Sequence, residues 1–593
     1  MKLSFFYFTL KFPHKKNGKI MDKGPSLDLS TMRKDSLMFG LIVFLWLCAA
    51  FYFTPRILAL LIGPENILAK FSIILFALLL NLFWFYGFYH LIIILFSYSK
   101  DTDNLGRSNE DKRSDEQNNP SVALLYTTCN DFKEEAVLSC FNQDYSNFHT
   151  FILDDSNEKG YKRRIDDLAL KYKGKITVIR RPDRKGYKAG NINYGLSKIK
   201  GFEYFNISDA DTILPKDYIL RLLPYFNKPN VAFVQARQEL NPNQNSSFAQ
   251  ELGFQIGLHY DHYLRTKNTY GFVMFYGHGA LMRYDIWKEI GGFPEVATED
   301  LAYSMKVRER GYFGVYVQDV VCYEDYPPTY QQYRRRNEKW IRGTAECLFK
   351  FYPSFLKSRR ISWVEKFDVL ASASSLLLAF PFLLLLLLVG FVLPFFFYHF
   401  RFQGPMFRMP IIFDSSLLNL AVGIKGNLFW RWDFFLMLLL ALVSPILPAI
   451  VQIFKRPGKR LRYIVMYTFV FYAMQLVSAL NLIAYLLTRK ATFSITGQER
   501  EDLKDSGGGP LGFFSRPVSN HKAVVFMEAV SAALFFLISL STQNIWFLSF
   551  GVGLIISVFL FNLGFENKLL KALVGIPLII TVIVVLFIGK TLQ

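Results

Sequence analysis

Two aspartates, Asp209 and Asp211, flank a single alanine directly after a short apolar segment of the chain. The residues before them, Phe205–Ile207, have the composition of the end of a buried strand. Mg²⁺ and Mn²⁺ are hard cations that prefer oxygen ligands and leave coordination positions for substrate phosphates. An isolated pair of this kind also fits a solvated turn, so its interpretation depends on the rest of the chain. We expect Asp209 and Asp211 to bind a divalent metal.

A second pair of aspartates, Asp154 and Asp155, follows another predicted strand, Thr150–Leu153. In open α/β sheets, ligands bind at the carboxyl ends of the strands. Asp209 follows the predicted strand Tyr204–Ile207 in the same way, so we expect both aspartate pairs at one edge of the sheet. There the second pair could bind the base and ribose of a nucleotide. Its structural alternative is the N-cap turn of the next helix.

Positive charge gathers in the segment RRPDRKGYKAGN, around the expected start of a helix. Its cations are Arg180, Arg181, Arg184, Lys185 and Lys188, and its glycines are Gly186 and Gly190. Cations beside a helix N-terminus suit a diphosphate, and we assign Lys188 to that role. The alternative is a solvated basic loop.

Two acidic residues, Glu299 and Asp300, stand at the start of the predicted helix Asp300–Arg310. Acids in a first turn favour the helix dipole, which is their structural alternative. The functional interpretation makes Asp300 a general base that takes a proton from an attacking hydroxyl group. Further along, Trp340 could stack its ring on the C–H face of a sugar, or anchor the chain at a membrane interface.

These candidate side chains all fall in one block, from Ser121 to about Tyr352, in which short apolar segments alternate with amphipathic ones. The block has the size of one large domain. The predicted strands are Val122–Tyr126, Thr150–Leu153, Ile176–Ile179, Tyr204–Ile207 and Val231–Val234, and the predicted helices are Lys133–Cys140, Tyr161–Tyr172, Ala189–Ile199 and Tyr218–Tyr225. This alternation predicts an open, mostly parallel α/β sheet with helices on both faces.

Long uncharged segments dominate the rest of the 593 residues, and 52% of the chain is apolar. We predict seven membrane spans: Leu37–Phe53, Phe71–Phe96, Val369–Tyr398, Phe434–Phe454, Ala523–Leu540, Ile545–Phe561 and Ala572–Ile588. The apolar segment Tyr463–Leu487 has basic residues at both ends, so we expect it at the cytoplasmic interface; as a span it would be the eighth. The net charge of +20 fits cytosolic loops of a multi-pass protein of the cell membrane, with the α/β domain in the cytosol.

The predicted order of segments is a cytosolic tail (1–36), two transmembrane helices (37–98), a charged linker (99–120), the α/β domain (121–352), interface helices with two spans (353–487), a cytosolic loop (488–522) and three spans (523–593). No nucleic-acid-binding motif accompanies the positive charge, so we expect no nucleic acid as a partner. The five cysteines form no CxxC or His/Cys cluster, which argues against a zinc or disulfide framework.

Six motifs follow one another in the α/β block. They are the Asp154-Asp155 pair, KAGN at Lys188–Asn191, DAD at Asp209–Asp211, GHGALMR at Gly277–Arg283, TED at Thr298–Asp300, and Trp340. In this order they resemble the motifs of the family-2 glycosyltransferases, specifically the processive membrane synthases of cellulose, hyaluronan and chitin. The resemblance covers roughly Ser121–Lys350, and the flanking membrane segments are similar in arrangement only.

This resemblance implies a GT-A (Rossmann-like) fold, a UDP-sugar donor, Mg²⁺ or Mn²⁺, and inversion at the anomeric carbon in a single displacement. The residues it assigns are Asp154, Asp155, Lys188 and Asp209 for the donor, Asp209 and Asp211 for the metal, and Asp300 with its neighbour Glu299 for catalysis. Processive members of the family pass a growing glycan through a tunnel beside the domain, which would account for the fused membrane spans.

A later segment, FSITGQ, resembles the FxVTxK gating motif of cellulose synthases. Phe493 and Thr496 match the motif, whereas Gln498 replaces its lysine. A short FxxT pattern is otherwise common. If the segment is a gate, it must lie in the cytosol, which agrees with the interfacial placement of Tyr463–Leu487.

The QxxRW motif of the family is altered in this chain. Arg336 replaces the glutamine and Lys339 replaces the arginine, while Trp340 is kept. Lys339 retains a positive charge for the donor but lacks the planar fork with which arginine grips phosphate. We expect Arg336 and Trp340 on the acceptor side.

Three functions remain in competition at this stage. The first is a synthase that elongates and exports a β-linked polysaccharide. The second, suggested by the altered QxxRW segment, is a non-processive transferase that adds one sugar to a lipid or lipid-linked acceptor. The third is a transporter or channel with a regulatory nucleotide-binding domain. Such proteins usually carry charges within their membrane spans. The spans predicted here have few, of which Glu528 is the clearest, and this argues against the third function.

Overall fold

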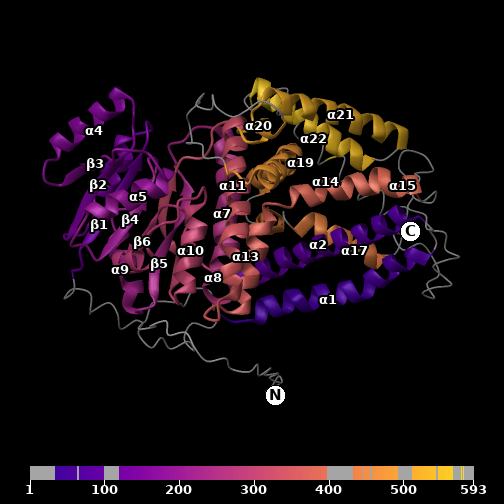
Figure 1. The fold of residues 1–593 in the computed structure, drawn as a ribbon, viewed down its shortest axis with the longest axis horizontal. Coiled ribbons are helices and arrows are strands. Elements are labelled where there is room, and N and C mark those ends of the chain that lie inside the picture. The colour runs from indigo at the N-terminus through magenta and orange to yellow at the C-terminus, as the bar shows by residue number, and fades with distance from the viewer. Residues whose placement is uncertain are drawn as a thin grey trace, which may run out of the picture. The chain divides into compact units, whose positions relative to one another are not determined.

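The structure is a computed structural model. It describes residues 34–62, 66–98, 119–396, 432–444, 447–453, 457–491, 510–542 and 545–564, with positions 576 and 579 beyond them. Lys34 and the residues after it belong to one unit, in which an α/β sheet continues into a set of apolar helices (Figure 1).

A seven-stranded sheet forms the core of the α/β domain. Its strands are β1 (Val122–Thr128), β2 (Phe148–Asp154), β3 (Ile176–Ile179), β4 (Tyr204–Ser208), β5 (Val231–Leu240), β6 (Ala280–Arg283) and β7 (Phe313–Glu324), in the spatial order β3-β2-β1-β4-β6-β5-β7. Neighbouring strands pair in parallel, except that β6 is antiparallel to both β4 and β5. The predicted fold class, a GT-A-like α/β core flanked by apolar helices, is confirmed.

The five strands predicted from the sequence are all present, and β3 has the predicted bounds. β5 is longer than predicted and continues to Leu240, because β7 lies beside it along its whole length, from Val231 opposite Phe313 to Leu240 opposite Glu324. The sequence analysis predicts neither β6 nor β7.

Helices cover both faces of the sheet. On one face lie α5 (Tyr187–Lys198), α9 (Tyr284–Ile290) and α10 (Glu299–Glu309), and on the other lie α3 (Glu134–Phe141), α4 (Lys159–Lys171) and α6 (Tyr218–Leu222). Successive residues of a strand point to opposite faces, so Leu125 of β1 packs with Ile192 of α5, whereas Leu124 packs with Ile219 of α6.

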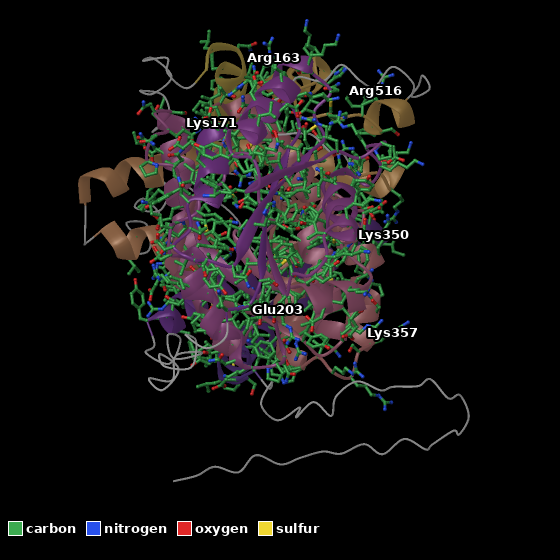
Figure 2. The ribbon with its side chains drawn as sticks, turned by 90° about the vertical axis from the view of Figure 1, so that its left-hand side faces the viewer. Arg163, Lys171, Glu203, Lys350, Lys357 and Arg516 are labelled. Carbon is green, nitrogen blue, oxygen red and sulfur yellow. The ribbon has the colours of Figure 1, made fainter. Side chains whose placement is uncertain are left out.

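The helix α4 illustrates how the outer surface is made. Ile165 and Leu168 are buried against the sheet, whereas Arg163 and Lys171 are exposed at the surface (Figure 2). The helical period of the apolar residues therefore places one face on the core and a charged face in solvent, as the sequence predicts.

Helical segments follow β5 and β7 and join the sheet to the apolar helices. After β5 come α7 (Ser247–Leu258), a π-helical segment (His259–Leu264) and α8 (Arg265–Tyr270), and after β7 come α11 (Tyr330–Lys350), α12 (Tyr352–Lys357) and α13 (Trp363–Ser375). Thr329 caps α11 by accepting a hydrogen bond from the backbone N–H of Gln332. Ile341 of α11 packs against Leu482 of a long helix, α19 (Pro457–Thr488).

The other apolar helices are α1 (Leu37–Leu58), α2 (Ile67–Ser97), α14 (Ala379–Leu387), α15 (Leu393–Phe396), α17 (Trp432–Val443), α18 (Leu447–Ile453), α20 (Pro510–Phe514), α21 (Lys522–Thr542) and α22 (Ile545–Leu563). Within the described residues, four stretches are long and apolar enough to cross a membrane: Leu37–Ile62, Ile67–Ser97, Val470–Thr488 and Lys522–Ser539. The bent pair of α13 and α14 makes a fifth if it is one span.

The predicted span Val369–Tyr398, in which Pro381 predicts an interruption, is broken in the structure. Its two halves, α13 and α14, meet at an angle of 62°. Pro381, in the first turn of α14, has no N–H to donate to the preceding turn, which favours a break there. Within α19, the segment Val470–Thr488 is long and apolar enough to cross a membrane. The placement of α19 in the membrane or at the interface therefore stays a prediction. The predicted span Ala572–Ile588 lies almost wholly outside the described residues.

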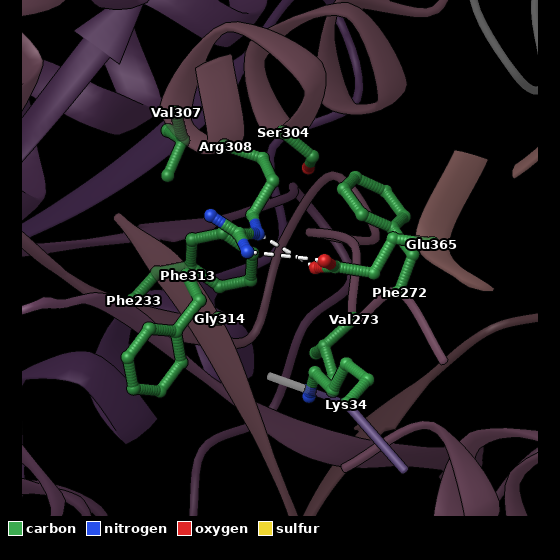
Figure 3. A pocket seen from close by; sticks show the side chains of 10 residues that line it. All are labelled: Lys34, Phe233, Phe272, Val273, Ser304, Val307, Arg308, Phe313, Gly314 and Glu365. Carbon is green, nitrogen blue, oxygen red and sulfur yellow. Dashed lines mark hydrogen bonds and ion pairs between the residues drawn. The ribbon is translucent and has the colours of Figure 1, made fainter. Parts of the chain in front are cut away.

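A buried polar junction fixes the start of α1 to the α/β domain. Lys34 Nζ donates hydrogen bonds to the backbone oxygens of Lys267, at 3.2 Å, and Asn268, at 2.6 Å. Beside it, Arg308 of α10 pairs with Glu365 of α13, with N–O distances of 2.6 and 3.0 Å (Figure 3). The junction therefore ties α1, α10 and α13 together around one small pocket.

Candidate active site

The carboxyl ends of three neighbouring strands bring the two aspartate pairs to one edge of the sheet. Thr128, the last residue of β1, lies opposite Asp154, the last residue of β2. Tyr126 of β1 lies opposite Ser208, which directly precedes Asp209. The expectation that the two pairs share an edge is therefore confirmed by the register of the sheet.

Each aspartate of the first pair has an arginine partner. Arg180 Nε lies 2.6 Å from Asp154 Oδ2. Arg181 grips Asp155 with two hydrogen bonds, from Nε to Oδ1 at 2.8 Å and from Nη2 to Oδ2 at 2.7 Å. The sequence analysis groups both arginines with the cations that suit a diphosphate. In the structure they neutralise the carboxylates instead, because acids at the strand ends and cations after β3 are brought together by the sheet.

The basic loop before α5 is closed by the same arginine. Arg181 also donates to the backbone oxygens of Lys185 and Tyr187, the latter at 2.9 Å. A Cβ added at Gly190 would collide with the backbone oxygen of Lys185 and crowd Arg181 Nη1, so the close approach requires glycine at this position. Asp155, Arg181 and the start of α5 thus form one connected unit.

Lys188 is the cation of this loop that reaches the second aspartate pair. Its Nζ forms an ion pair with Asp209 and donates a hydrogen bond of 2.8 Å to the backbone oxygen of Gly277. A Cβ built on Gly277, whose φ is +84°, would lie 3.7 Å from Asp300 Oδ2 and 3.8 Å from Lys188 Nζ. Lys188, Asp209 and Asp300 therefore meet around the Gly277 turn, although they lie far apart in the sequence.

The charges in this cleft shift one another's pKa values. Burial lowers the pKa of Lys188, but the negative charges of Asp209, Glu299 and Asp300 outweigh burial and raise it. Burial raises the pKa of Asp209, but the positive charges of Lys188, His278 and Lys339 and the hydrogen bond from Lys188 together outweigh burial, and the pKa of Asp209 falls below its ordinary value. Near neutral pH, Lys188 is therefore a cation and Asp209 an anion.

Asp300 lies in the first turn of α10 and is a weaker acid than an ordinary aspartate. Its Oδ1 accepts a hydrogen bond of 2.8 Å from the backbone N–H of Leu301. Burial, with the negative charge of Glu299 next to it, raises the pKa of Asp300 to about 6, while Lys339 and Lys188 oppose that rise. A carboxylate with such a pKa is ionised at neutral pH and is a stronger base than an ordinary aspartate, as a general base requires.

The loop that carries Glu299 and Asp300 is packed against α11. Thr298 Oγ1 lies 3.0 Å from Cys347 Sγ. A Cβ on Gly343 would lie 2.6 Å from Thr298 Cγ2, so the absence of a side chain at Gly343 permits the close packing. Glu299 itself is buried, with 4% of its surface exposed.

Asp211 lies among residues that the sequence analysis did not assign to the site. Burial, with the negative charges of Glu324 and Asp209, raises the pKa of Asp211 to about 7. His278 bridges this group: its Nε2 lies 3.2 Å from Glu324 Oε2 and its Nδ1 lies 3.0 Å from Thr212 Oγ1. Burial lowers the pKa of His278, but Glu324 outweighs burial and raises it.

The carboxylates fit a divalent cation that is completed by ligands from a substrate. In the described part of the chain, no group of three or more His, Cys, Asp or Glu side chains is arranged to hold a metal alone. Asp209 and Asp211 supply two carboxylates, and Glu324 Oε1 is buried without a hydrogen-bond partner among the described residues. Mg²⁺ and Mn²⁺ sites often take one or two carboxylates together with substrate phosphates, so this donor set is suitable.

The altered QxxRW segment lies on α11 and faces the same cleft. The Arg336 guanidinium carbon lies 4.5 Å from the centre of the Trp340 ring and 5.4 Å from that of Tyr326. The positive charge of Lys339 lowers the pKa of both Asp209 and Asp300, so Lys339 lies within their electrostatic reach. Arg336 therefore covers one face of Trp340, the ring expected to stack on a sugar.

Two predicted residues, Phe493 and Thr496, lie outside the described residues. The sequence analysis did not assign three further residues to the site: His278, Glu324 and Gly343. His278 belongs to the GHGALMR motif, which carried a signal, whereas Glu324 ends a strand that the sequence analysis did not predict. Gly343 follows the tryptophan of the QxxRW segment and has no chemical signature of its own.

Comparison with known proteins identifies the domain that contains this cleft. Residues 129–343 match the model of a family described as glycosyltransferase like family 2. This segment is a family-2 glycosyltransferase domain. The match includes both aspartate pairs, Lys188, Asp300 and the QxxRW segment.

Curated relatives match a little more than a third of the chain. "Probable glucomannan 4-beta-mannosyltransferase 11" of Oryza sativa subsp. japonica is 29% identical over 225 residues, which cover 36% of this chain and 39% of the relative. "Glucomannan 4-beta-mannosyltransferase 2" of Arabidopsis thaliana is 26% identical over 242 residues, 37% of this chain and 43% of the relative. The chain thus matches about two fifths of the length of these relatives.

Solved structures with a similar arrangement share less of the sequence. The mannosyltransferase PcManGT from Pyrobaculum calidifontis, in complex with GDP-Man and Mn²⁺, is 18% identical with a TM-score of 0.41, and the match covers 66% of this chain and all of that one. The S. aureus protein TarS is 14% identical with a TM-score of 0.28, and the match covers 61% of this chain and 52% of that one.

Proposed function

We propose that this protein is a membrane-embedded, inverting hexosyltransferase that polymerises sugar from a nucleotide-sugar donor into a β-linked polysaccharide. The observation that carries the proposal is the meeting of Lys188, Asp209 and Asp300 around the Gly277 turn. A cation, a metal-binding acid and a base of raised pKa then lie within one cleft, as transfer from a sugar diphosphate requires.

The residues of the cleft divide the work of such a reaction. Asp300 accepts the proton of the acceptor hydroxyl while that oxygen attacks the anomeric carbon and the bond to the diphosphate breaks. Lys188 and Lys339 stabilise the negative charge that develops on the departing diphosphate. Asp155, held by Arg181, supports the nucleotide side of the cleft.

Asp209 and Asp211 would hold the Mg²⁺ or Mn²⁺ ion. When bound, the ion supplies positive charge that neutralises the diphosphate as it leaves. The raised pKa of Asp211 supports this assignment, because it arises from burial next to the negative charges of Glu324 and Asp209, which a bound cation would offset. We therefore expect chelation of divalent cations to abolish transfer and Mn²⁺ or Mg²⁺ to restore it.

Two observations bear on the sugar and the nucleotide of the donor. The motifs of the domain favour a UDP-sugar, whereas the curated relatives carry the name glucomannan 4-beta-mannosyltransferase. We therefore propose a hexosyl donor of the glucose or mannose type, and both UDP- and GDP-linked forms belong in the test.

The apolar helices support a location in the cell membrane. Four stretches of the described chain have the length and composition of spans, and basic residues flank the first pair. We propose that the glycosyltransferase domain lies in the cytosol and that the helices beside it pass the growing glycan across the bilayer.

The test is a transfer assay on membranes that contain the full chain. Membranes are incubated with radiolabelled UDP- and GDP-hexoses and Mn²⁺, and an Asp300→Asn variant serves as the control. We expect donor consumption and a product of high molecular weight from the wild type only. Equal donor consumption by the wild type and the variant would reject the proposal.

A second candidate function is favoured by one observation at α11. Arg336 covers a face of Trp340 that a polymer would be expected to stack on. A non-processive transferase that places one sugar on a lipid or lipid-linked acceptor needs no such extended platform. A single-sugar glycolipid as the product of the same assay would support this candidate, and a high-molecular-weight product would exclude it.

A further inference from the structure

Helix α11 presents charged and small residues on two different faces. Arg334, Glu338 and Arg342 follow one another at intervals of four residues, so they lie on one side of the helix. Lys339 and Gly343 lie on the side that faces the cleft, where Gly343 contacts the loop before Asp300. The residues of the second face take part in the proposed function, whereas those of the first face do not.

The first face contains a fully buried ion pair. Arg334 Nη1 lies 3.0 and 2.8 Å from the two carboxylate oxygens of Glu528 in α21, and neither side chain has exposed surface. Arg334 Nε donates to the backbone oxygen of Ser519 at 2.8 Å. Ser557 of α22 donates to Glu528 Oε1 at 3.2 Å. A single charged pair therefore joins α11 to two apolar helices.

The same face also holds the chain segment that leads into α21. Glu338 accepts hydrogen bonds from the backbone N–H groups of Val518, at 3.1 Å, and Ser519, at 3.0 Å. Arg342 pairs with Glu338 at 2.9 Å and donates to the backbone oxygen of Arg516 at 3.1 Å. These directional bonds fix α11 both along and around its own axis relative to α21.

The position of α11 in turn determines the geometry of the cleft. Cys347 and Gly343 touch Thr298, which stands two residues before Asp300. Lys339, on the same face, acts on the charges of Asp209 and Asp300. A shift of α11 would therefore move a phosphate-side cation and the base loop together.

We infer that Arg334, Glu338 and Glu528 are positioning residues, which set α11 so that Lys339 and the Asp300 loop face each other across the donor. The inference rests on the proposed function. Replacing a buried ion pair by apolar residues often leaves a protein as stable as before. The directional bonds of the charged network fix a register that apolar packing would leave free, which suits them to set the position of α11.

Activity measurements on three variants test the positioning role. Glu528→Ala leaves Arg334 buried without its partner, and the double variant Arg334→Met with Glu528→Met restores apolar packing without the charges. We expect both to lower kcat by about ten- to a hundredfold, since a misplacement of about 1 Å costs that order, with little change in donor binding. Val530→Ala, an exposed position on α21, is the matched control and should keep wild-type values.

A cross-link provides a readout that does not depend on turnover. Thr298→Cys places a thiol beside the native Cys347, and the yield of the disulfide between this new thiol and Cys347 reports how closely α11 packs on the base loop. In membranes, we expect a high yield in the Thr298→Cys background and with Val530→Ala added, and a severalfold lower yield with Glu528→Ala or the double methionine variant added.

Each outcome of these measurements has a defined meaning. If the double methionine variant recovers thermal stability, kcat and disulfide yield together, the ion pair is only structural and the inference is wrong. If it recovers stability alone, the inference holds. If the wild type transfers no sugar, the proposed function fails, whereas the disulfide yields still decide whether Glu528 sets the position of α11.

Discussion

Asp300 and Asp209 show how neighbours give two identical side chains different acidities within one cleft. Lys188 pairs with Asp209 and keeps its pKa below the ordinary value. Asp300 lies near the same lysine but is buried beside Glu299, and its pKa rises to about 6. An enzyme that needs one permanently charged acid and one proton acceptor separates the two roles in this way.

The pKa of Asp300 predicts the pH dependence of transfer. A base acts only when ionised, so activity should rise as the pH increases through about 6 and level off above it. Because Asp211 has a pKa of about 7, initial rates are measured at saturating Mn²⁺, which keeps a bound carboxylate ionised. Asp300→Asn should remove the activity at every pH. Rates that stay constant on both sides of this pH would contradict Asp300 as the base.

Gly277 offers a second prediction at the residue scale, with a matched control in the same domain. Gly277 has a φ of +84°, and a methyl group there would stand 3.7 Å from Asp300 and 3.8 Å from Lys188. Gly174 has a φ of +83° but no atom within 4 Å of the same position. Alanine at either site should cost about 1 kcal/mol of stability through backbone strain.

Only Gly277→Ala should also lower kcat, because its methyl group narrows the space where the acceptor hydroxyl must approach Asp300. The measurements are thermal unfolding and donor turnover of both variants. Equal turnover by Gly277→Ala and Gly174→Ala would show that the turn does not border the reacting groups.

The residues of the cleft differ in how far the sequence could predict them. Asp209 and Asp300 stand in motifs with a chemical signature, and both were assigned. Glu324 has no such signature, because it reaches the cleft only through the pairing of β7 with β5. His278 lay in a recognised motif, yet its hydrogen bonds to Thr212 and Glu324 depend on tertiary contacts that no local pattern encodes.

At the scale of elements, short apolar segments were the most reliable signal. They predicted β1 to β5, because helices cover both faces of the sheet and a strand such as β1 is buried along its whole length. The four residues of β6, ALMR, lack the β-branched composition of the equally short β3, ITVI, and the antiparallel direction of β6 is set by its neighbours on both sides. Pro381 predicts an interruption in the span Val369–Tyr398, and the structure shows one as the bend between α13 and α14, but the angle of 62° has no signal in the sequence because the apolar composition continues through the bend.

The contact between α11 and the Asp300 loop gives a prediction for an element. A methyl group at Gly343 would approach Thr298 Cγ2 to 2.6 Å, so Gly343→Ala should push α11 away from the loop. Overpacking of this kind costs about 1–3 kcal/mol, against a gain of about 1 kcal/mol in helix propensity. We expect a small change in stability and a clear loss of kcat, measured in the transfer assay.

Gly160→Ala in α4 is the control for Gly343→Ala, because a methyl group there meets no atom within 4 Å. It should keep wild-type turnover. Wild-type turnover by Gly343→Ala as well would mean that the separation of α11 from the base loop is not critical for the reaction.

At the scale of the whole unit, the α/β domain is joined to the apolar helices by buried polar contacts as well as by apolar packing. Arg308 pairs with Glu365, and Lys267 pairs with Asp368, in each case across the boundary between the domain and α13. Lys34 adds the start of α1 to the same junction. Such contacts are directional, so they fix how the domain is seated on the helices that would carry its product.

Asp368 gives the sharpest test of this junction. Its carboxylate accepts from Lys267 Nζ at 2.8 Å and from the backbone N–H of Phe272 at 2.7 Å, and it is almost fully buried. Asp368→Ala would leave a buried ammonium group and a buried N–H without their partner, which should cost about 3–5 kcal/mol. The expected result is a large drop in the temperature at which the full chain unfolds in detergent.

Asp319→Ala, at an exposed acid of β7, should change that temperature little. If Asp368→Ala unfolds at the same temperature as Asp319→Ala, the contact between Lys267 and Asp368 adds nothing to the joint, and the domain must be held on its helices by apolar packing and the remaining polar contacts.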